Sequence, residues 1–281
     1  MAGEIELSAS HVGELLTCPR RWFMPRRAGA SSGSALRASI GSLVHRICAE
    51  NMDQWSLPEA LAELEAAWPE IELSAEWQRS AELADAKAAV QRFDGWLQLR
   101  NRQLIGTEVR VDGTITVPSG TARVRGSIDR LERDAEGAYY VVDLKTGTSQ
   151  SDEIKQSHRL QIGVYQAVVA SGGVEAIGPA SVSGAELVHL RIGAGKGQAN
   201  PKVDYQSGLV DVPWPDEAEP VNGCCNWIEA SVDKALRIVT SGEYPAIANS
   251  GCGHCPARAG CPALVPMDPA TAGSDRRRNV P

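Results

Sequence analysis

The sequence lacks any apolar run near the ~18 residues that a membrane-spanning helix needs. Its first ten residues, MAGEIELSAS, also lack the basic start and apolar stretch of a secretion signal. We therefore expect a cytoplasmic protein with no membrane partner. The Walker A pattern G-x-x-x-x-G-K-S/T is absent as well, so this polypeptide carries no nucleotide-driven motor of its own.

An excess of positive charge is also missing, since the net charge is −7. That balance argues against a protein that passively coats DNA. A phosphodiesterase tolerates it, because bound cations change the local charge. The charges are unevenly distributed, with nine acidic and three basic residues in 59–94 and six arginines within the first fifty residues.

The cysteines do not suit a disulfide scaffold, because there are seven of them in a chain expected in the cytoplasm. Three of them, Cys252, Cys255 and Cys261, form a C-x2-C-x5-C pattern, and Cys18 is the best candidate for a fourth ligand. Four thiolates hold zinc or an iron–sulfur cluster, and the spacing alone does not separate the two. His254 lies inside the triad as a competing ligand.

The hydrophobic pattern predicts one large α/β domain. We expect a short helix capped by Ser10 and ending near Cys18, and helices over 36–54, from Pro58, over 76–100, over 155–170 and over 217–240. Strands are expected over 107–117, 122–133, 138–145 and 185–192, with Asp112-Gly113 as a tight-turn signal. Core packing is expected for Trp68, Trp77 and Trp96 of the helical region.

Two acidic residues in neighbouring predicted strands form a candidate metal site. Asp143 and Lys145 are two residues apart, so both point to the same side of a strand. Asp129 lies in the preceding strand, where a hairpin brings it beside Asp143. A divalent cation such as Mg²⁺ or Mn²⁺ relieves the repulsion between the two carboxylates. The alternative is a surface hairpin with an Asp–Lys pair, but Asp143 follows a buried-looking run.

Three segments, GSIDRLE (126–132), VVDLKTG (141–147) and QIGVYQ (161–166), resemble the PD-(D/E)XK nucleases of the RecB-like branch. The resemblance implies a restriction-endonuclease-like core with a central mixed sheet flanked by helices. It implies a catalytic motif of Asp129, Asp143 and Lys145. The further residues that it implies are His45 of GSLVH (41–45) as a metal ligand, the Leu144 backbone carbonyl as another, and Gln161 and Tyr165 as active-site and DNA contacts.

Glu108, at the start of the predicted meander, is a weaker candidate for a further active-site acid. A solvated glutamate at the end of a strand is at least as good an interpretation.

The cysteine pattern resembles that of AddB- and AdnB-type RecB-like nucleases, which carry one early cysteine and a late C-x2-C-x5-C triad. The resemblance implies a [4Fe–4S] cluster on Cys18, Cys252, Cys255 and Cys261, with a zinc knuckle as the alternative. Such a cluster closes a loop of more than two hundred residues, which restricts the unfolded chain. Arg20 and Arg21, next to Cys18, are candidate DNA contacts.

These features predict a single nuclease domain over 1–267. Its parts are a helical region (about 8–100), a catalytic core (about 105–240) and a cysteine clasp of residue 18 with 249–263, followed by a disordered tail over 268–281.

We expect a metal-dependent DNA nuclease, an exonuclease by resemblance, that processes single-stranded DNA ends in repair and recombination. AddB- and AdnB-like proteins carry such a domain at the end of a helicase, so a helicase is expected as partner or parent chain. Met1 and the tail favour a free-standing chain. The alternative is a non-catalytic iron–sulfur or zinc DNA-binding module, and the intact Asp129, Asp143 and Lys145 argue against it.

Overall fold

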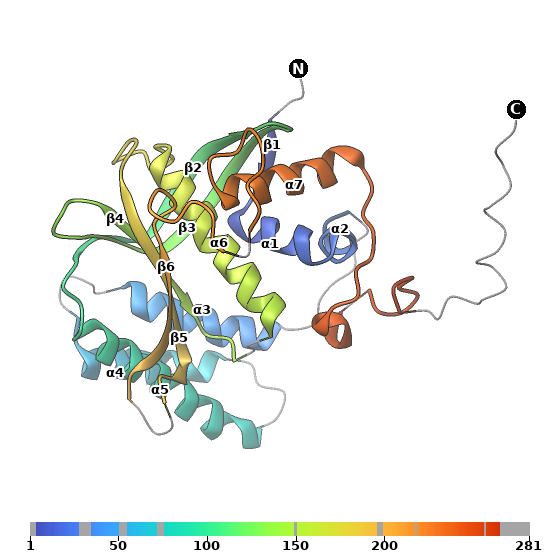
Figure 1. Cartoon of the computed structure of the whole chain (residues 1–281). Coiled ribbons are helices and arrows are strands. Elements are labelled where there is room, and N and C mark those ends of the chain that lie inside the picture. The colour runs from blue at the N-terminus through green and yellow to red at the C-terminus, as the bar shows by residue number, and fades with distance from the viewer. Residues whose placement is uncertain are drawn as a thin grey trace, which may run out of the picture.

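The computed structural model describes residues 4–27, 35–50, 55–71, 76–148, 151–195, 199–216, 218–255 and 257–264. The tail predicted for 268–281 lies outside these residues. Within them, six strands form one mixed sheet (Figure 1), which confirms the predicted α/β class. The strands are β1 (Ile5–Leu7), β2 (Gln103–Val117), β3 (Gly120–Arg133), β4 (Tyr139–Lys145), β5 (Val182–Gly193) and β6 (Pro201–Ser207).

The strand order is β1-β3-β4-β5-β6, with β2 paired to β3. Two neighbouring pairs, β1 with β3 and β4 with β5, are parallel, and the others are antiparallel. The parallel β4–β5 pair needs a crossover, which α6 (Asp152–Ala170) supplies. The predicted three-strand meander is therefore present, while β1 and the edge strand β6 were not expected from the sequence.

Helices cover both faces of the sheet. The helices α1 (Ala9–Thr17), α2 (Pro19–Arg27), α6 and α7 (Trp227–Ser241) pack on one face. The helices α3 (Ala35–Ala49), α4 (Leu57–Ala67) and α5 (Arg79–Leu97) pack on the other, and they gather in the lower part of Figure 1. Short 3₁₀ turns occupy η2 (Trp68–Glu70), η3 (Glu76–Gln78) and η4 (Ser250–His254).

Two hydrophobic cores result from this arrangement. Successive residues of a strand point to opposite faces, and Val141 belongs to the core under α6 while Val142 belongs to the core under α5. Both valines are fully buried. Among the described residues, no helix is both long and apolar enough to cross a membrane.

The tight turn predicted at Asp112-Gly113 is wrong, because β2 runs through it without interruption. Gly113 is needed there for a close approach, since a Cβ on it would lie 2.8 Å from the Gly173 Cα. The Asp112 amide donates to the Gly173 carbonyl at 2.9 Å. The glycine therefore reflects contact between β2 and the end of α6, and the hairpin turn follows Val117 instead.

Two predicted helix starts also need correction. The first helix is capped by Ser8 rather than Ser10. Ser8 and His11 form a capping box, in which the Ser8 amide donates a hydrogen bond to the His11 Nδ1 at 3.1 Å. The last helix begins at Trp227, ten residues later than predicted, because the Asn226 side chain accepts hydrogen bonds from the Ile228 and Glu229 amides.

The tryptophans of the helical layer divide into two kinds. Trp68 and Trp96 are buried as expected, but Trp77 is 78% exposed and does not belong to the core. Helix α2 was not predicted at all. It carries Trp22, which is buried against Tyr244 and His11.

A buried ion-pair cluster joins the helical layer to the sheet. Glu132 of β3 and Glu186 of β5 are fully buried, and Arg100 pairs with both, at 2.5 Å and 2.7 Å. Arg102 and Arg130 also pair with Glu132, at 3.6 Å and 2.6 Å. Several largely buried arginines therefore depend on two fully buried carboxylates for their charge balance.

Replacing Glu132 by Gln should lower the free energy of unfolding by about 3–5 kcal/mol, because it leaves buried arginines without their main carboxylate. Urea denaturation followed by circular dichroism measures this change. Asp152→Asn removes an exposed acid that pairs with Lys155 and serves as the control, with little change expected. Equal stability of the Glu132→Gln and wild-type proteins would contradict the assigned role of the cluster.

Candidate metal centre and active site

The site forms where β3 and β4 separate. Their pairing runs from Arg133↔Tyr139 to Arg130↔Val142, and no further pair is formed beyond it. The next residues along the two strands are Asp129 and Asp143, at the mouth of this opening. The Leu144 amide donates to the Asp129 Oδ2 at 2.6 Å, so a side chain replaces the backbone ladder at this point.

Three side chains bring metal-ligand atoms together in the opening. His45 from α3, Glu108 from β2 and Asp129 from β3 each offer one such atom, and these atoms lie within 4.8 Å of one another. The His45 Nδ1 is 3.5 Å from the Asp129 Oδ2. Two carboxylates and an imidazole form a donor set that suits Mg²⁺ or Mn²⁺.

Glu108 has a strained backbone. Its φ is +48°, a left-handed value that non-glycine residues rarely adopt. Its carboxylate accepts a hydrogen bond from the Ser127 Oγ at 2.8 Å on the neighbouring strand. Strain of this kind persists where the surroundings enforce it and is concentrated at functional sites. Sequence reasoning left Glu108 as a weaker candidate, because a backbone conformation leaves no mark in the pattern of residues.

Lys145 lies between two oxygen atoms on the α6 side of the opening. Its Nζ is 2.7 Å from the Asp143 Oδ2 and donates to the Gln161 Oε1 at 2.8 Å. The Gln161 Nε2 in turn donates to the Asp143 Oδ1 at 3.0 Å. The three side chains therefore form a closed ring that fixes the lysine amino group beside the two acidic residues.

Burial and mutual repulsion mark the acidic residues. Desolvation and the neighbouring Asp143 charge raise the pKa of Asp129 well above its usual value. Desolvation lowers the pKa of His45, although the Asp143 charge opposes this effect. The site therefore presents a neutral imidazole and a carboxyl group whose negative charge is poorly compensated, which is the condition that a bound cation relieves.

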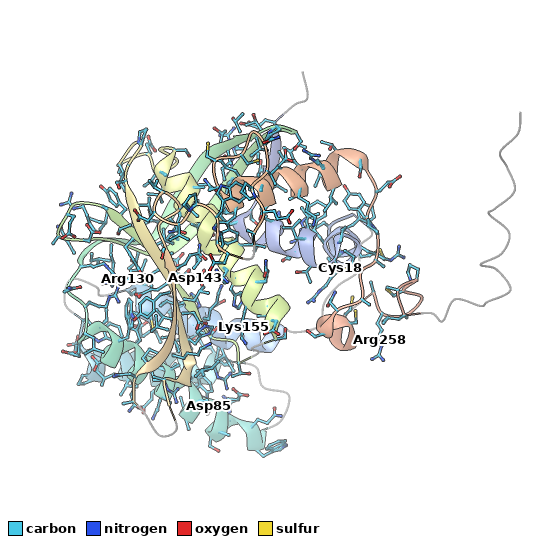
Figure 2. All side chains as sticks on the ribbon, in the orientation of Figure 1. Cys18, Asp85, Arg130, Asp143, Lys155 and Arg258 are labelled. Atoms are coloured by element: carbon cyan, nitrogen blue, oxygen red, sulfur yellow. The ribbon has the colours of Figure 1, made fainter. Side chains whose placement is uncertain are left out.

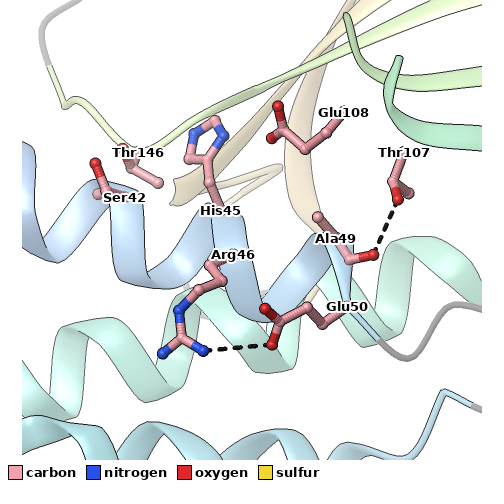
Figure 3. A pocket seen from close by; sticks show the side chains of 9 residues that line it. Ser42, His45, Arg46, Ala49, Glu50, Thr107, Glu108 and Thr146 are labelled. Carbon is pink, nitrogen blue, oxygen red and sulfur yellow. Dashed lines mark hydrogen bonds and ion pairs between the residues drawn. The ribbon is translucent and has the colours of Figure 1, made fainter. Parts of the chain in front are cut away.

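Helix α3 approaches the end of β4 closely, and Gly41 makes this possible. A Cβ at Gly41 would lie only 2.8 Å from the Thr146 Oγ1. Gly41 and His45 are one helical turn apart on the same face of α3. The close approach at Gly41 therefore also brings the imidazole of His45 near the end of β4. Figure 3 shows His45 and Glu108 side by side above Arg46 and Glu50 in the pocket that they line, which has a volume of about 700 Å³.

Helix α6 supplies the opposite wall. Gln161 and Tyr165 occupy the same helix face one turn apart, as predicted. Tyr165 is buried, and a Cβ on Gly126 would lie 3.0 Å from its hydroxyl oxygen. Burial, followed by the charges of Asp143 and Asp129, raises the pKa of Tyr165 to about 12. Its phenol therefore stays protonated and faces the acidic pair as a neutral group.

The cysteine segment lies next to the start of the chain and away from the acidic pair. The Ile247 amide donates to the Cys18 Sγ at 3.5 Å, and the Asn249 amide donates to the Cys252 Sγ at 3.3 Å. All seven cysteines are free thiols. Figure 2 shows Cys18 near the C-terminal segment that carries Arg258, with Asp143 in the middle of the fold.

The two arginines next to Cys18 also face this segment. The Arg20 amide donates to the Pro245 carbonyl at 3.2 Å. Arg21 is exposed, and its guanidinium approaches Gly251 closely enough that a Cβ there would meet it at 2.7 Å. The His254 side chain, the competing ligand, lies outside the described residues.

The structure thus brings together His45, Asp129, Asp143, Lys145, Gln161 and Tyr165, which the sequence singled out. Leu144 contributes its amide to Asp129, and a role for its carbonyl stays a prediction. Glu108 completes the metal-ligand group.

Comparison with known proteins places the chain in a family. A solved structure described as "Crystal structure of SSO0001" is 16% identical to this chain, covers 95% of it and 90% of its own length, and has a TM-score of 0.45. No curated protein matches the chain. The model of the PD-(D/E)XK nuclease superfamily matches residues 6–262. That superfamily implies metal-dependent nuclease activity, and because the match spans nearly the whole sequence, the chain belongs to the PD-(D/E)XK nuclease superfamily.

Proposed function

We propose that this protein is a Mg²⁺- or Mn²⁺-dependent deoxyribonuclease that hydrolyses phosphodiester bonds. The observation that carries the proposal is the position of Lys145, which the Asp143–Gln161 ring holds beside the metal-ligand group of His45, Glu108 and Asp129. A lone Asp–Lys pair is common on protein surfaces. Here the pair is largely buried and adjoins a group of possible cation ligands, where a lysine can stabilise negative charge on a phosphate.

The carboxylates of Glu108 and Asp129 and the imidazole of His45 fit a divalent cation. His45, Glu108 and Asp129 would hold it, with Asp143 and the Leu144 carbonyl as further predicted ligands. When bound, such an ion supplies Lewis-acid polarisation of the phosphate and a water of lowered pKa. Desolvation, followed by the Asp143 charge, raises the pKa of Asp129, and this is the feature of this structure that favours binding of a cation.

The chain's own side chains then position the substrate. Lys145 is placed to donate a hydrogen bond to a phosphate oxygen and to stabilise the negative charge that develops there. Gln161 accepts from the lysine and donates to Asp143, so it keeps both groups in their orientations. Tyr165 closes the site on the Gly126 side and is a further candidate DNA contact.

We further propose that Cys18, Cys252, Cys255 and Cys261 bind a [4Fe–4S] cluster. Cys18 and Cys261 are buried, none of the four is in a disulfide, and Cys18 and Cys252 already accept backbone hydrogen bonds. Such hydrogen bonds stabilise thiolate ligands. A cluster there would hold the first helices and the C-terminal segment together, and zinc is the alternative ion.

The biological context stays a prediction of the sequence. We propose a RecB-like exonuclease, of the AddB or AdnB type, that acts on DNA with a single-stranded end in repair or recombination. A helicase would be its partner or its parent chain, Arg20 and Arg21 would contact the DNA, and the protein would be cytoplasmic. The single domain over 1–267 is part of the same proposal.

The nuclease proposal is tested with end-labelled single- and double-stranded DNA in Mg²⁺ or Mn²⁺. Asp143→Asn should abolish cleavage, because it weakens cation binding and breaks the ring that holds Lys145. Lys145→Met should slow cleavage by roughly 10²–10³-fold. Asp152→Asn, a fully exposed acid on the first turn of α6, should cleave at the wild-type rate.

Cleavage that persists in Asp143→Asn would exclude the proposed site. Wild-type protein that binds DNA but never cleaves it would favour the alternative, a non-catalytic DNA-binding module.

The contact between α3 and β4 gives a second prediction. Gly41→Ala should reduce cleavage, because the new methyl group meets the Thr146 Oγ1 and displaces His45 from the metal-ligand group. Adding Thr146→Ala removes that oxygen and leaves the Thr146 Cβ position at 3.7 Å, an ordinary contact. The double variant should therefore recover activity. If the double variant is as slow as Gly41→Ala, the contact does not position His45.

The cluster proposal is tested on anaerobically purified protein. We expect a brown colour, with iron and acid-labile sulfide in equal amounts, and loss of both in Cys18→Ser. Cys225→Ser, which alters an exposed cysteine outside the pattern, should keep them. Stoichiometric zinc without iron would replace the cluster with a zinc site, and protein with neither metal would contradict both assignments.

A further inference from the structure

Among the described residues that line the pocket beside the metal-ligand group, one side chain is positively charged. These residues number nine, and they include His45 and Glu108 of the metal-ligand group. Around them are the small or hydroxyl-bearing residues Gly41, Ser42, Thr107 and Thr146. Arg46 is the one lysine or arginine among the nine. At about 700 Å³ the pocket has room for a nucleotide next to the scissile phosphate.

Arg46 is held by two acids. Its Nη1 is 3.3 Å from the Glu50 Oε2, one turn along α3, and 2.8 Å from the Glu63 Oε1 on α4. Figure 3 shows the guanidinium directed toward Glu50 and away from His45 and Glu108. The three side chains are 47%, 49% and 28% exposed. Ion pairs at such exposure contribute little to stability, so a stronger partner can replace them.

A phosphate diester is such a partner. The guanidinium binds phosphate through two parallel hydrogen bonds, which is a better fit than one nitrogen shared between two separate carboxylates. Without Arg46, the charged groups that the described part of the pocket wall offers to an incoming strand are the carboxylates of Glu50 and Glu108, apart from the imidazole. A cation at the metal-ligand group would compensate Glu108, but it would leave the rest of the pocket unfavourable for a second phosphate.

We propose that Arg46 binds the phosphate adjoining the scissile one. Until nucleic acid enters the pocket, Glu50 and Glu63 keep the guanidinium of Arg46 in ion pairs. Arg46 is therefore a substrate-positioning residue, and Glu63 acts on DNA binding only through it. The inference rests on the proposed nuclease function, but its test measures binding without cleavage.

The test uses the Asp143→Asn background, which should not cleave, with Ca²⁺ and a fluorescein-labelled single-stranded oligodeoxynucleotide. Anisotropy gives the dissociation constant Kd at several salt concentrations. Arg46→Ala should raise Kd roughly tenfold, the scale expected for losing one charged hydrogen-bonding group. It should also lower the slope of log Kd against log salt by about 0.7, the contribution of one phosphate contact on a single strand.

Glu63→Gln should have the opposite effect to Arg46→Ala. It removes one of the two ion pairs of Arg46, so the arginine binds phosphate more readily and Kd should fall. Glu59→Gln removes the same charge from the exposed start of α4 and controls for general electrostatics. In the Arg46→Ala background, Glu63→Gln should affect Kd no more than Glu59→Gln does. Arg237→Ala, which alters an exposed arginine paired with an acid four residues earlier on α7, should leave the salt slope unchanged.

Three results would overturn the inference. The first is an unchanged Kd and salt slope in Arg46→Ala. The second is an equal effect of Glu63→Gln and Glu59→Gln. The third is an Arg46→Ala variant that loses folding stability while binding DNA normally, which would make the ion pairs a structural link between α3 and α4. Arg46-dependent binding by a wild-type protein that never cleaves would reject only the nuclease proposal, and absence of any DNA binding would reject both.

Discussion

The repulsion between two neighbouring carboxyl groups, the buried Asp143 and the partly buried Asp129, is the constraint on which the rest of the site depends. Both lie where β3 and β4 cease to pair, although β4 continues its ladder with β5 through Asp143. The two carboxylates have different hydrogen-bond and ion-pair partners. Asp143 receives the amino group of Lys145 and the amide of Gln161, whereas Asp129 receives a backbone amide and faces His45. The charge of Asp143 is therefore largely compensated by side chains of the protein. Asp129 is left with a poorly compensated charge, which a bound cation would balance.

The two helical layers have separate tasks around this pair. Helix α6 is the crossover between the parallel strands β4 and β5, so it must cross the sheet face onto which Asp143 and Lys145 project. It thereby brings Gln161 to them. Helix α3 reaches the opening from the other layer, and the glycine at position 41 lets it approach β4 closely enough for His45 to meet Asp129. The buried arginine–glutamate cluster anchors the residues that follow α5 to β3 and β5, and thus helps to fix the second layer against the sheet.

The sequence predicted the residues of the site better than the shape around it. Asp129, Asp143 and Lys145 could be paired because the period of a strand and the length of a hairpin are local properties. Gln161 and Tyr165 came from the resemblance to RecB-like nucleases, because helical spacing alone makes them ordinary residues of one helix face. Glu108 was ranked low because a solvated glutamate at the end of a strand was at least as good an interpretation, and its left-handed backbone leaves no mark in the sequence. The glycine at position 113 was misread for a similar reason: its cause is Gly173, sixty residues away in the chain. The exposure of Trp77 likewise depends on how the helices pack, which periodicity does not specify.

An acidic protein that binds a polyanion must confine its attraction to the place where chemistry occurs. With a net charge of −7, this chain gains little from general electrostatic attraction to DNA. Its metal-ligand group is itself repulsive to phosphate while Glu108 and Asp129 carry uncompensated charge. The pocket's arginine is at the same time engaged by two acids. A bound cation would compensate the charges of Glu108 and Asp129. An entering phosphate would replace the two acids as the partner of the Arg46 guanidinium. Productive binding therefore requires both events at adjacent points, which favours a strand that already reaches the metal over one that merely touches the surface.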